Sequence, residues 1–116
     1  MSRGVVWRPA GQVGYASAMN RTEAVSKLRE YAPAIRAMGA TSLYLFGSTA
    51  RDEAGPGSDL DLFIDYDPVK KFSLFDLAGV KLFLEERLQG PVDVTTRNGL
   101  HPMLRADIEA NAVRVF

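Results

Sequence analysis

The sequence predicts an α/β domain in which helices cover a small sheet. Three short apolar runs have the length and composition of strands, at residues 42–46, 60–65 and 92–96. Segments with apolar residues at helical spacing precede, separate and follow these runs. A chain of 116 residues has room for one domain with one hydrophobic core.

The first residues of the chain show neither a helical nor a strand period. They contain several glycines and a proline, and we predict an irregular tail over residues 1–19, followed by one folded domain over residues 20–116. Met19 stands directly before the first helical pattern. One hypothesis is that the segment before it is an extra leader or the product of an upstream start codon.

The first helix is expected to begin after Asn20, because asparagine caps helix N-termini and Glu23 follows three residues later. Pro33 should kink or split this helix, and Gly39 suits its end. Apolar residues recur along one side of it at helical spacing: Val25, Leu28, Ala32 and Ile35.

The middle of the chain predicts strand, short helix, turn and strand. Residues 42–46 form the first strand, residues 48–53 a short helix, and residues 54–57 a turn. The second strand, residues 60–65, alternates between two faces. Leu60, Leu62 and Ile64 should face the core, with Asp59, Asp61 and Phe63 on the other face.

The second half opens with another capping signature, Ser73 followed by Asp76. A helix with an apolar stripe should follow and stop at Gly90 and Pro91. The stripe consists of Leu77, Val80, Leu84 and Leu88. Residues 92–96 then form the third strand, which places Asp93 and Thr95 on one face.

The C-terminal part predicts one more helix. His101 and Pro102 should begin it, and it should run through Ala110, with Leu104 and Ile108 facing inward. Residues 112–116 either add a short strand or pack back on the domain.

Composition excludes several classes of protein. With 14 basic and 14 acidic residues the formal net charge is zero, so no direct binding to nucleic acid or to an anionic membrane is predicted. No apolar run approaches the length of a membrane span. The chain has no cysteine, which fits a cytoplasmic protein. Acidic charge is concentrated over residues 52–67, which contain six acidic and no basic residues.

Two carboxylates stand one residue apart at the start of the second strand. Asp59 and Asp61 would lie side by side on one face and repel each other unless a cation lies between them. Oxygen ligands are those that Mg²⁺ uses when it carries a nucleoside triphosphate. Asp93 adds a third carboxylate on another strand. Gly47 and Ser48 end the first strand at a turn whose backbone N–H groups can bind phosphate.

The spacing Gly47-Ser48, ten residues, Asp59-x-Asp61, with Asp93 further on, resembles the nucleotidyltransferase superfamily that includes DNA polymerase beta. In particular it resembles the minimal nucleotidyltransferase (MNT) proteins, the antitoxins of HEPN-domain ribonuclease toxins. The resemblance runs from about residue 22 to residue 111. It implies a minimal nucleotidyltransferase fold, in which the small sheet is mixed.

The resemblance also implies a reaction, the Mg²⁺-dependent transfer of AMP from ATP to a hydroxyl group. Two Mg²⁺ ions would be held by three carboxylates, those of Asp59, Asp61 and Asp93, and Asp93 would orient or deprotonate the acceptor. Nucleotide would be bound by Gly47, Ser48, Arg51 and Ser58. Arg51 could instead contact a partner or be a solvated charge. The family often has glycine directly after this arginine, whereas this chain has Asp52.

Larger relatives carry a second domain that binds the acceptor, and 116 residues leave no room for one. The resemblance therefore implies a partner, a HEPN toxin that is silenced when one of its tyrosines is adenylylated. Two alternatives stay open at this point. The chain could be an antitoxin that blocks its toxin by binding alone, or one half of a dimeric enzyme that modifies a small aminoglycoside-like molecule.

Overall fold

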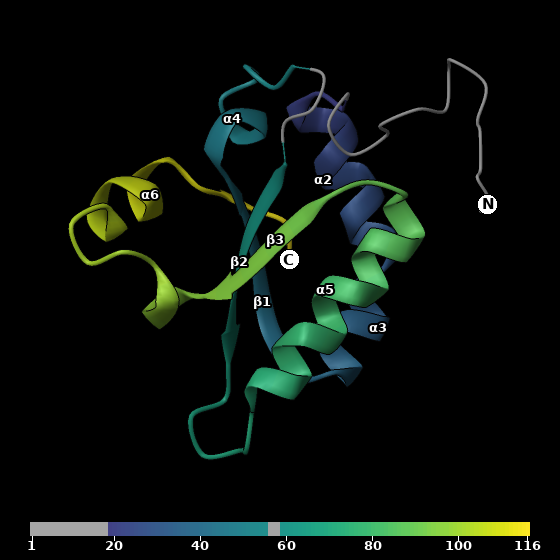
Figure 1. The fold of residues 1–116 in the computed structure, drawn as a ribbon, viewed down its shortest axis with the longest axis vertical. Coiled ribbons are helices and arrows are strands. Elements are labelled where there is room, and N and C mark those ends of the chain that lie inside the picture. The colour runs from purple at the N-terminus through teal and green to yellow at the C-terminus, as the bar shows by residue number, and fades with distance from the viewer. Residues whose placement is uncertain (1–18, 56–58) are drawn as a thin grey trace.

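The computed structural model describes residues 19–55 and 59–116, and they form a four-stranded sheet with helices on both sides (Figure 1). The strands are β1 (Ala40–Phe46), β2 (Leu60–Tyr66), β3 (Val92–Thr96) and β4 (Val113–Arg114). They are ordered β3-β2-β1-β4. β2 and β3 are parallel, whereas β1 pairs antiparallel with both β2 and β4. The predicted α/β class and mixed sheet are confirmed. The tail predicted over residues 1–19 lies outside the described residues except for Met19, so the boundary between tail and domain stays a prediction.

The N-terminal helix is split at Tyr31 into α2 (Arg21–Glu30) and α3 (Ala32–Ala37), as Pro33 predicts. Asn20 caps α2, because its side chain accepts a hydrogen bond from the Glu23 N–H, and the Glu23 side chain accepts one from the Asn20 N–H. Both parts of the prediction are confirmed. Gly39, with φ +116°, lies two residues beyond α3 and turns the chain into β1.

The helix that follows β1 is shorter than predicted. It is the single turn α4 (Gly47–Ala50), whereas the sequence predicted a helix over 48–53. The predicted end is wrong because Asp52 adopts a left-handed conformation, φ +60°, which a right-handed helix cannot include. Residues 56 and 57 of the turn predicted over 54–57 lie outside the described residues.

α5 (Leu74–Leu88) begins where Ser73 and Asp76 cap each other's backbone, as predicted. It ends before Gly90 and Pro91, but the left-handed residue that closes it is Gln89, with φ +55°.

Among the described residues, no helix is both long enough and apolar enough to cross a membrane.

The C-terminal helix α6 (Arg105–Asn111) starts later than His101, and a short 3₁₀ helix, η2 (Arg97–Gly99), comes before it unpredicted. The start was wrong because the His101 ring accepts a hydrogen bond from the Met103 N–H through Nδ1. This local turn competes with the helix. Leu104 was expected to face inward but is 55% exposed, whereas Ile108 is half-buried as expected.

The main core lies on one face of the sheet, under α2, α3 and α5, as Figure 1 shows. The alternation of β2 is confirmed, because its three aliphatic residues are fully buried there. The members with no exposed surface include Leu28, Ile35, Leu43, Leu45, Leu60, Leu62, Ile64, Val80 and Leu84. The other face of the sheet carries Asp61, Asp93 and Phe63.

A second, smaller packed region covers part of that other face. Phe63 is fully buried there, although the sequence assigns it to the face away from the core. The Tyr44 ring stacks on the Phe63 ring at 4.8 Å between centroids, and the Arg97 guanidinium lies 4.9 Å from each ring centroid. The Tyr44 ring and the Arg97 guanidinium together exclude water from the Phe63 ring.

Arg97 joins three segments of this face. Its guanidinium donates to both carboxylate oxygens of Asp65 on β2 at 2.8 Å, and to Glu109 on α6 at 2.7 Å. The hydrogen bonds from Arg97 hold the pKa of Asp65 below its usual range, since they favour the ionised carboxylate. Arg97 therefore fastens α6 to the sheet.

Replacing Arg97 with methionine should lower the free energy of unfolding by about 2 kcal/mol, because the half-buried Asp65 carboxylate loses the partner that donates to both of its oxygens. The loss should appear at neutral pH and shrink as pH falls below about 4. A carboxyl whose pKa is lowered by folding stabilises the fold above its unfolded pKa, and protonation removes that contribution. Urea denaturation at pH 7 and pH 3 measures this dependence.

Arg87→Met is the matched control, because Arg87 also pairs with one carboxylate, Glu86, and lies over one ring, Phe83, but on an exposed surface. Its effect should stay below about 1 kcal/mol. Equal losses of the free energy of unfolding in the two variants would contradict the conclusion that Arg97 fastens α6 to the sheet.

Candidate nucleotidyl-transfer site

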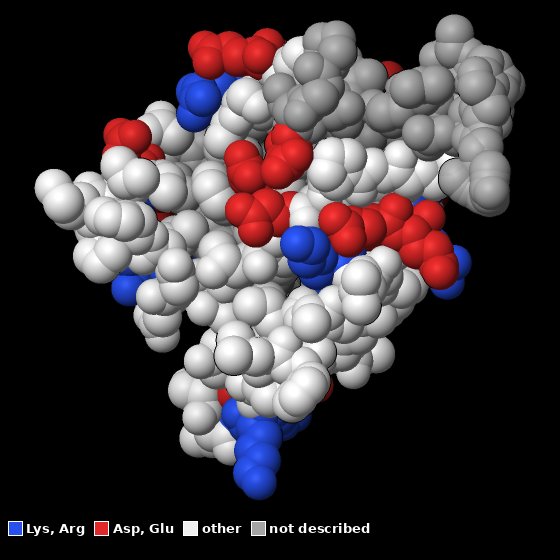
Figure 2. Space-filling view, viewed as in Figure 1, with Lys and Arg blue, Asp and Glu red and all other residues white. Residues whose placement is uncertain are grey.

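The three predicted carboxylates lie near one another at the start of the strands β2 and β3. Asp61 and Asp93 are paired in the parallel register, and both lie on the face away from the main core. Asp59 directly precedes β2 and is exposed. Figure 2 shows acidic side chains gathered in the middle of this view, over the ends of these strands and beside α4.

The electrostatics of Asp61 report how close these groups are. Partial burial, together with the negative charges of Asp93 and Asp59, raises the pKa of Asp61 from 3.8 to about 6, and the Arg51 cation opposes this shift. Two neighbouring carboxylates thus act on a third that is already partly desolvated. A cation bound between them would relieve this repulsion.

Gly47 is required beside Asp61 for a steric reason. Its φ is +75°, in the left-handed region, and a Cβ at this position would collide with Oδ2 of Asp61. The backbone at the start of α4 therefore lies against the carboxylate that would hold a metal ion. A phosphate bridging the metal and this backbone needs that close approach.

Ser48 and Arg51 lie on α4 and just after it. Ser48 is half-buried in this single helical turn. Arg51 is exposed, and its Nε donates to Glu53 at 3.0 Å. Because its charge also acts on Asp61, the guanidinium lies within electrostatic range of the carboxylate cluster. Ser58 lies outside the described residues, and its role stays a prediction.

The structure shows how Asp52 is accommodated at a position where the resemblance predicts glycine. It adopts φ +60°, a conformation that glycine reaches without steric cost. Asp52 Oδ1 accepts a hydrogen bond from the Arg21 N–H at 2.8 Å, in the first turn of α2. Arg21 in turn donates from its side chain to the carbonyl oxygen of Ala50 at 3.3 Å. These bonds offset the strain and fasten the loop after α4 to α2.

The donor set suits Mg²⁺ rather than a metal that needs a closed cage. Within residues 19–55 and 59–116, no three His, Cys, Asp or Glu side chains form a preassembled metal site. Mg²⁺ needs none, because it commonly uses one or two carboxylates, water and the phosphates of its substrate. Asp61 and Asp93 offer such ligands side by side, with Asp59 next to them.

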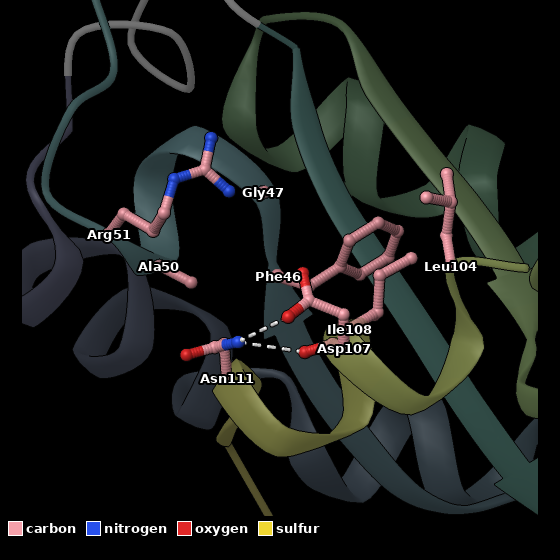
Figure 3. Close-up of a pocket in the computed structure, with 8 residues that line it drawn as sticks. All are labelled: Phe46, Gly47, Ala50, Arg51, Leu104, Asp107, Ile108 and Asn111. Carbon is pink, nitrogen blue, oxygen red and sulfur yellow. Dashed lines mark hydrogen bonds between the residues drawn. The ribbon is translucent and has the colours of Figure 1, made fainter.

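The sequence did not point to the residues on α6 beside this cluster. A groove lies between α4 and α6, and it is lined by Gly47 and Arg51 on one side and by Asp107, Ile108 and Asn111 on the other (Figure 3). The spacing of Asp107, Ile108 and Asn111 indicates one side of a helix. Only the fold shows that this side faces α4.

The nucleotidyltransferase domain model matches residues 25–115, which contain the carboxylates and the turn described above. The chain belongs to this family. It is accordingly an enzyme of the nucleotidyltransferase class, as the sequence predicted.

Two proteins of Methanocaldococcus jannaschii are similar to this nucleotidyltransferase along most of its length. "Putative protein adenylyltransferase MJ0435" is 39% identical over 88 residues, which cover 76% of this chain and 92% of that protein. A second protein with the same type of name, MJ0126, is 34% identical over 76 residues, 64% of this chain and 74% of its own length.

Solved structures show the same fold. One described as a "putative minimal nucleotidyltransferase" is 37% identical with a TM-score of 0.67, covering 84% of this chain and 97% of its own. A toxin–antitoxin structure with AMP-PNP has a TM-score of 0.60 at 17% identity, over 84% of this chain and 73% of its own. A tri-AMPylated Shewanella oneidensis HEPN toxin with its MNT antitoxin gives 0.57 at 14% identity, over 79% and 71%. The last two share the fold, and the minimal nucleotidyltransferase resemblance is confirmed.

Gly47→Ala should lower the free energy of unfolding by about 1–3 kcal/mol, because an alanine at this position would combine a left-handed backbone with a collision against Asp61. In an Asp61→Ala background the same substitution should cost less, since the colliding carboxylate is gone. A double-mutant cycle by urea denaturation measures the difference.

Gly79→Ala is the control for this cycle. Gly79 lies within α5, and a Cβ there would meet no atom within 4 Å. Alanine should therefore stabilise the protein by roughly 0.5–1 kcal/mol. Identical costs for Gly47→Ala with and without the Asp61 carboxylate would rule out the collision.

Asp61→Asn should raise the melting temperature of the metal-free protein by a few degrees at pH 7.5. Folding raises the pKa of Asp61 to about 6, so ionising this group destabilises the native state above that pH. The gain should disappear below pH 3.8, where the carboxyl is protonated in both states. Because Asp61 is half-exposed, about 1 kcal/mol is the expected limit.

Melting curves with EDTA and with Mg²⁺ at pH 7.5 provide the measurement. Mg²⁺ should raise the melting temperature of the wild type and leave Asp61→Asn nearly unchanged. Glu86→Gln, which removes an exposed charge on α5, should behave as the wild type in both buffers. A destabilised metal-free Asp61→Asn variant would contradict the repulsion.

Proposed function

We propose that this nucleotidyltransferase transfers AMP from ATP to a hydroxyl group of a partner protein, in a reaction that requires Mg²⁺. The observation that carries the proposal is the pairing of Asp61 with Asp93, directly beside a glycine turn that the carboxylate of Asp61 touches. Such a site brings metal ligands and a phosphate-binding backbone into contact. The names of the Methanocaldococcus jannaschii relatives support a protein as the acceptor.

Each residue of the site has a proposed role. Asp59 and Asp61, with Asp93, would hold two Mg²⁺ ions, which offset the charge of the triphosphate when bound. Gly47 and Ser48 would bind phosphate oxygens through backbone N–H groups and a hydroxyl. Ser58 is proposed to add a further phosphate contact, and Arg51 would neutralise part of the triphosphate charge from outside the carboxylate cluster.

The chemical step is an in-line displacement at phosphorus. The acceptor oxygen forms a bond to the α-phosphorus of ATP, and the bond from that phosphorus to the bridging oxygen of the β-phosphate breaks. Pyrophosphate leaves with the electron pair of that bond. The proton of the acceptor hydroxyl passes to the carboxylate of Asp93 or to water. Asp93 is suited to this because it is exposed and lies on β3, which pairs with β2 on the side away from β1.

We infer that the partner is a HEPN toxin and that the acceptor is one of its tyrosines, so that this chain acts as an antitoxin in the cytoplasm. Support comes from solved structures of the same fold, which include an AMPylated HEPN toxin with an MNT antitoxin and a toxin–antitoxin with AMP-PNP. Two features support a location in the cytoplasm. The absence of cysteine fits a reducing compartment, and the proposed reaction consumes ATP.

Intact-mass spectrometry tests the proposal. The chain is incubated with ATP, Mg²⁺ and a HEPN-domain protein of the same genome, and the partner should gain one or more AMP units. Asp59→Asn/Asp61→Asn should abolish the gain while still binding the partner. Glu86→Gln should retain it. A stable complex with no gain in mass would contradict the transfer and favour inhibition by binding alone.

A further inference from the structure

The groove between α4 and α6 adjoins the proposed phosphate-binding turn at Gly47 and Ser48, and the proposed transfer reaction assigns no role to it. Its volume is about 360 Å³, within the range of small-molecule sites. Gly47 and Arg51 belong both to the turn beside Asp61 and to the wall of the groove. A molecule whose phosphates lie at this turn can therefore extend directly into the groove.

Most of the groove surface is apolar. Phe46, the neighbour of Asp61 in the β1–β2 register, lines it together with Ala50 on α4. Leu104 and Ile108 line it from the α6 side, as Figure 3 shows. Leu104 is 55% exposed, which leaves part of this wall open to solvent. Apolar walls on two facing helices suit a flat, weakly polar ring.

The two ends of the groove differ in charge. Arg51 contributes a cation at the α4 side, whereas Asp107 contributes a carboxylate on the α6 side. A triphosphate is attracted to the first and repelled by the second. The α6 side thus favours an uncharged part of a nucleotide, namely its base.

Asn111 offers a fixed hydrogen-bond acceptor on the α6 side. Its Nδ2 donates to the carbonyl oxygen of Asp107 at 2.8 Å and lies 3.4 Å from the Asp107 carboxylate. These contacts determine which end of the amide is nitrogen. The carbonyl oxygen Oδ1 consequently points away from Asp107 (Figure 3). Among the described residues it accepts no hydrogen bond, which leaves it available to an N–H donor of a ligand.

We propose that the groove binds the nucleobase and that Asn111 Oδ1 accepts a hydrogen bond from the 6-amino group of adenine. This inference rests on the proposed function, since it names the base of the nucleotide that the site uses. Hypoxanthine has a carbonyl oxygen at position 6, which would face Asn111 Oδ1, and two hydrogen-bond acceptors repel each other. Asn111 therefore favours adenine over hypoxanthine.

Calorimetric titration of the full chain with three ligands in Mg²⁺ tests the inference. The ligands are ATP, inosine triphosphate, which has a carbonyl in place of the 6-amino group, and inorganic triphosphate, which has no base. The wild type should bind ATP about tenfold more tightly than inosine triphosphate. Asn111→Ala should weaken ATP binding about tenfold, should not weaken the binding of inosine triphosphate, and should leave inorganic triphosphate unchanged.

Leu104→Ser tests the apolar wall independently of Asn111. It should weaken ATP and inosine triphosphate alike, by about fivefold, and leave inorganic triphosphate unchanged. Met103→Ser is its matched control, because Met103 is the preceding residue, is 87% exposed and does not line the groove. Circular dichroism of each variant establishes that it is folded.

The outcomes separate this inference from the proposed function. If the wild type transfers AMP and the Asn111→Ala variant binds ATP as tightly as the wild type does, the proposed role of Asn111 is overturned. Equal losses for all three ligands would place the phosphates, not the base, in the groove, and would also overturn it. A wild type that binds no ATP in Mg²⁺ would refute the proposed function, and this inference with it.

Discussion

The parallel pairing of β2 with β3 is the constraint on which the site depends. It sets Asp61 beside Asp93, a like-charged pair that weakens the sheet at this point. The aliphatic side chains on the opposite face of the same strands hold this register, because a slip of one residue would turn Leu60 and Leu62 toward water. The stability of the buried face thus maintains a repulsive arrangement on the exposed one.

Local signals allowed much of the fold to be predicted. The capping pairs at Asn20 and Ser73 gave the starts of α2 and α5, and Pro33 gave the break between α2 and α3. The alternation from Leu60 onward separated the core from the face that carries Asp61. Each of these signals acts between residues near each other in sequence, so no tertiary contact was needed to read it. The roles assigned to the site residues are of another kind, since they depended on the spacing of the whole motif.

Most of the errors occurred where contacts between residues distant in sequence decide the structure. The end of α4 depends on Asp52, whose left-handed backbone is supported by the first turn of α2, 31 residues away. The unpredicted η2 begins at Arg97, whose side chain bonds to Asp65 and Glu109. The late start of α6 has a local cause instead, the hydrogen bond from the Met103 N–H to the His101 ring. The groove beside the site likewise forms between helices that follow different strands, and periodicity cannot show which side of α6 meets α4.

The last strand, β4, has a consequence for solubility. It covers the free edge of β1 through the pairs Tyr44–Arg114 and Leu45–Val113, and Leu43 exchanges hydrogen bonds with Val115 and Phe116. Arg29 on α2 fastens this segment by donating to the carbonyl oxygen of Val115 at 2.9 Å. An uncovered β1 would present a seven-residue edge that can pair with another chain. Residues 113–116 thus keep the β1 edge of the sheet from adding a foreign strand.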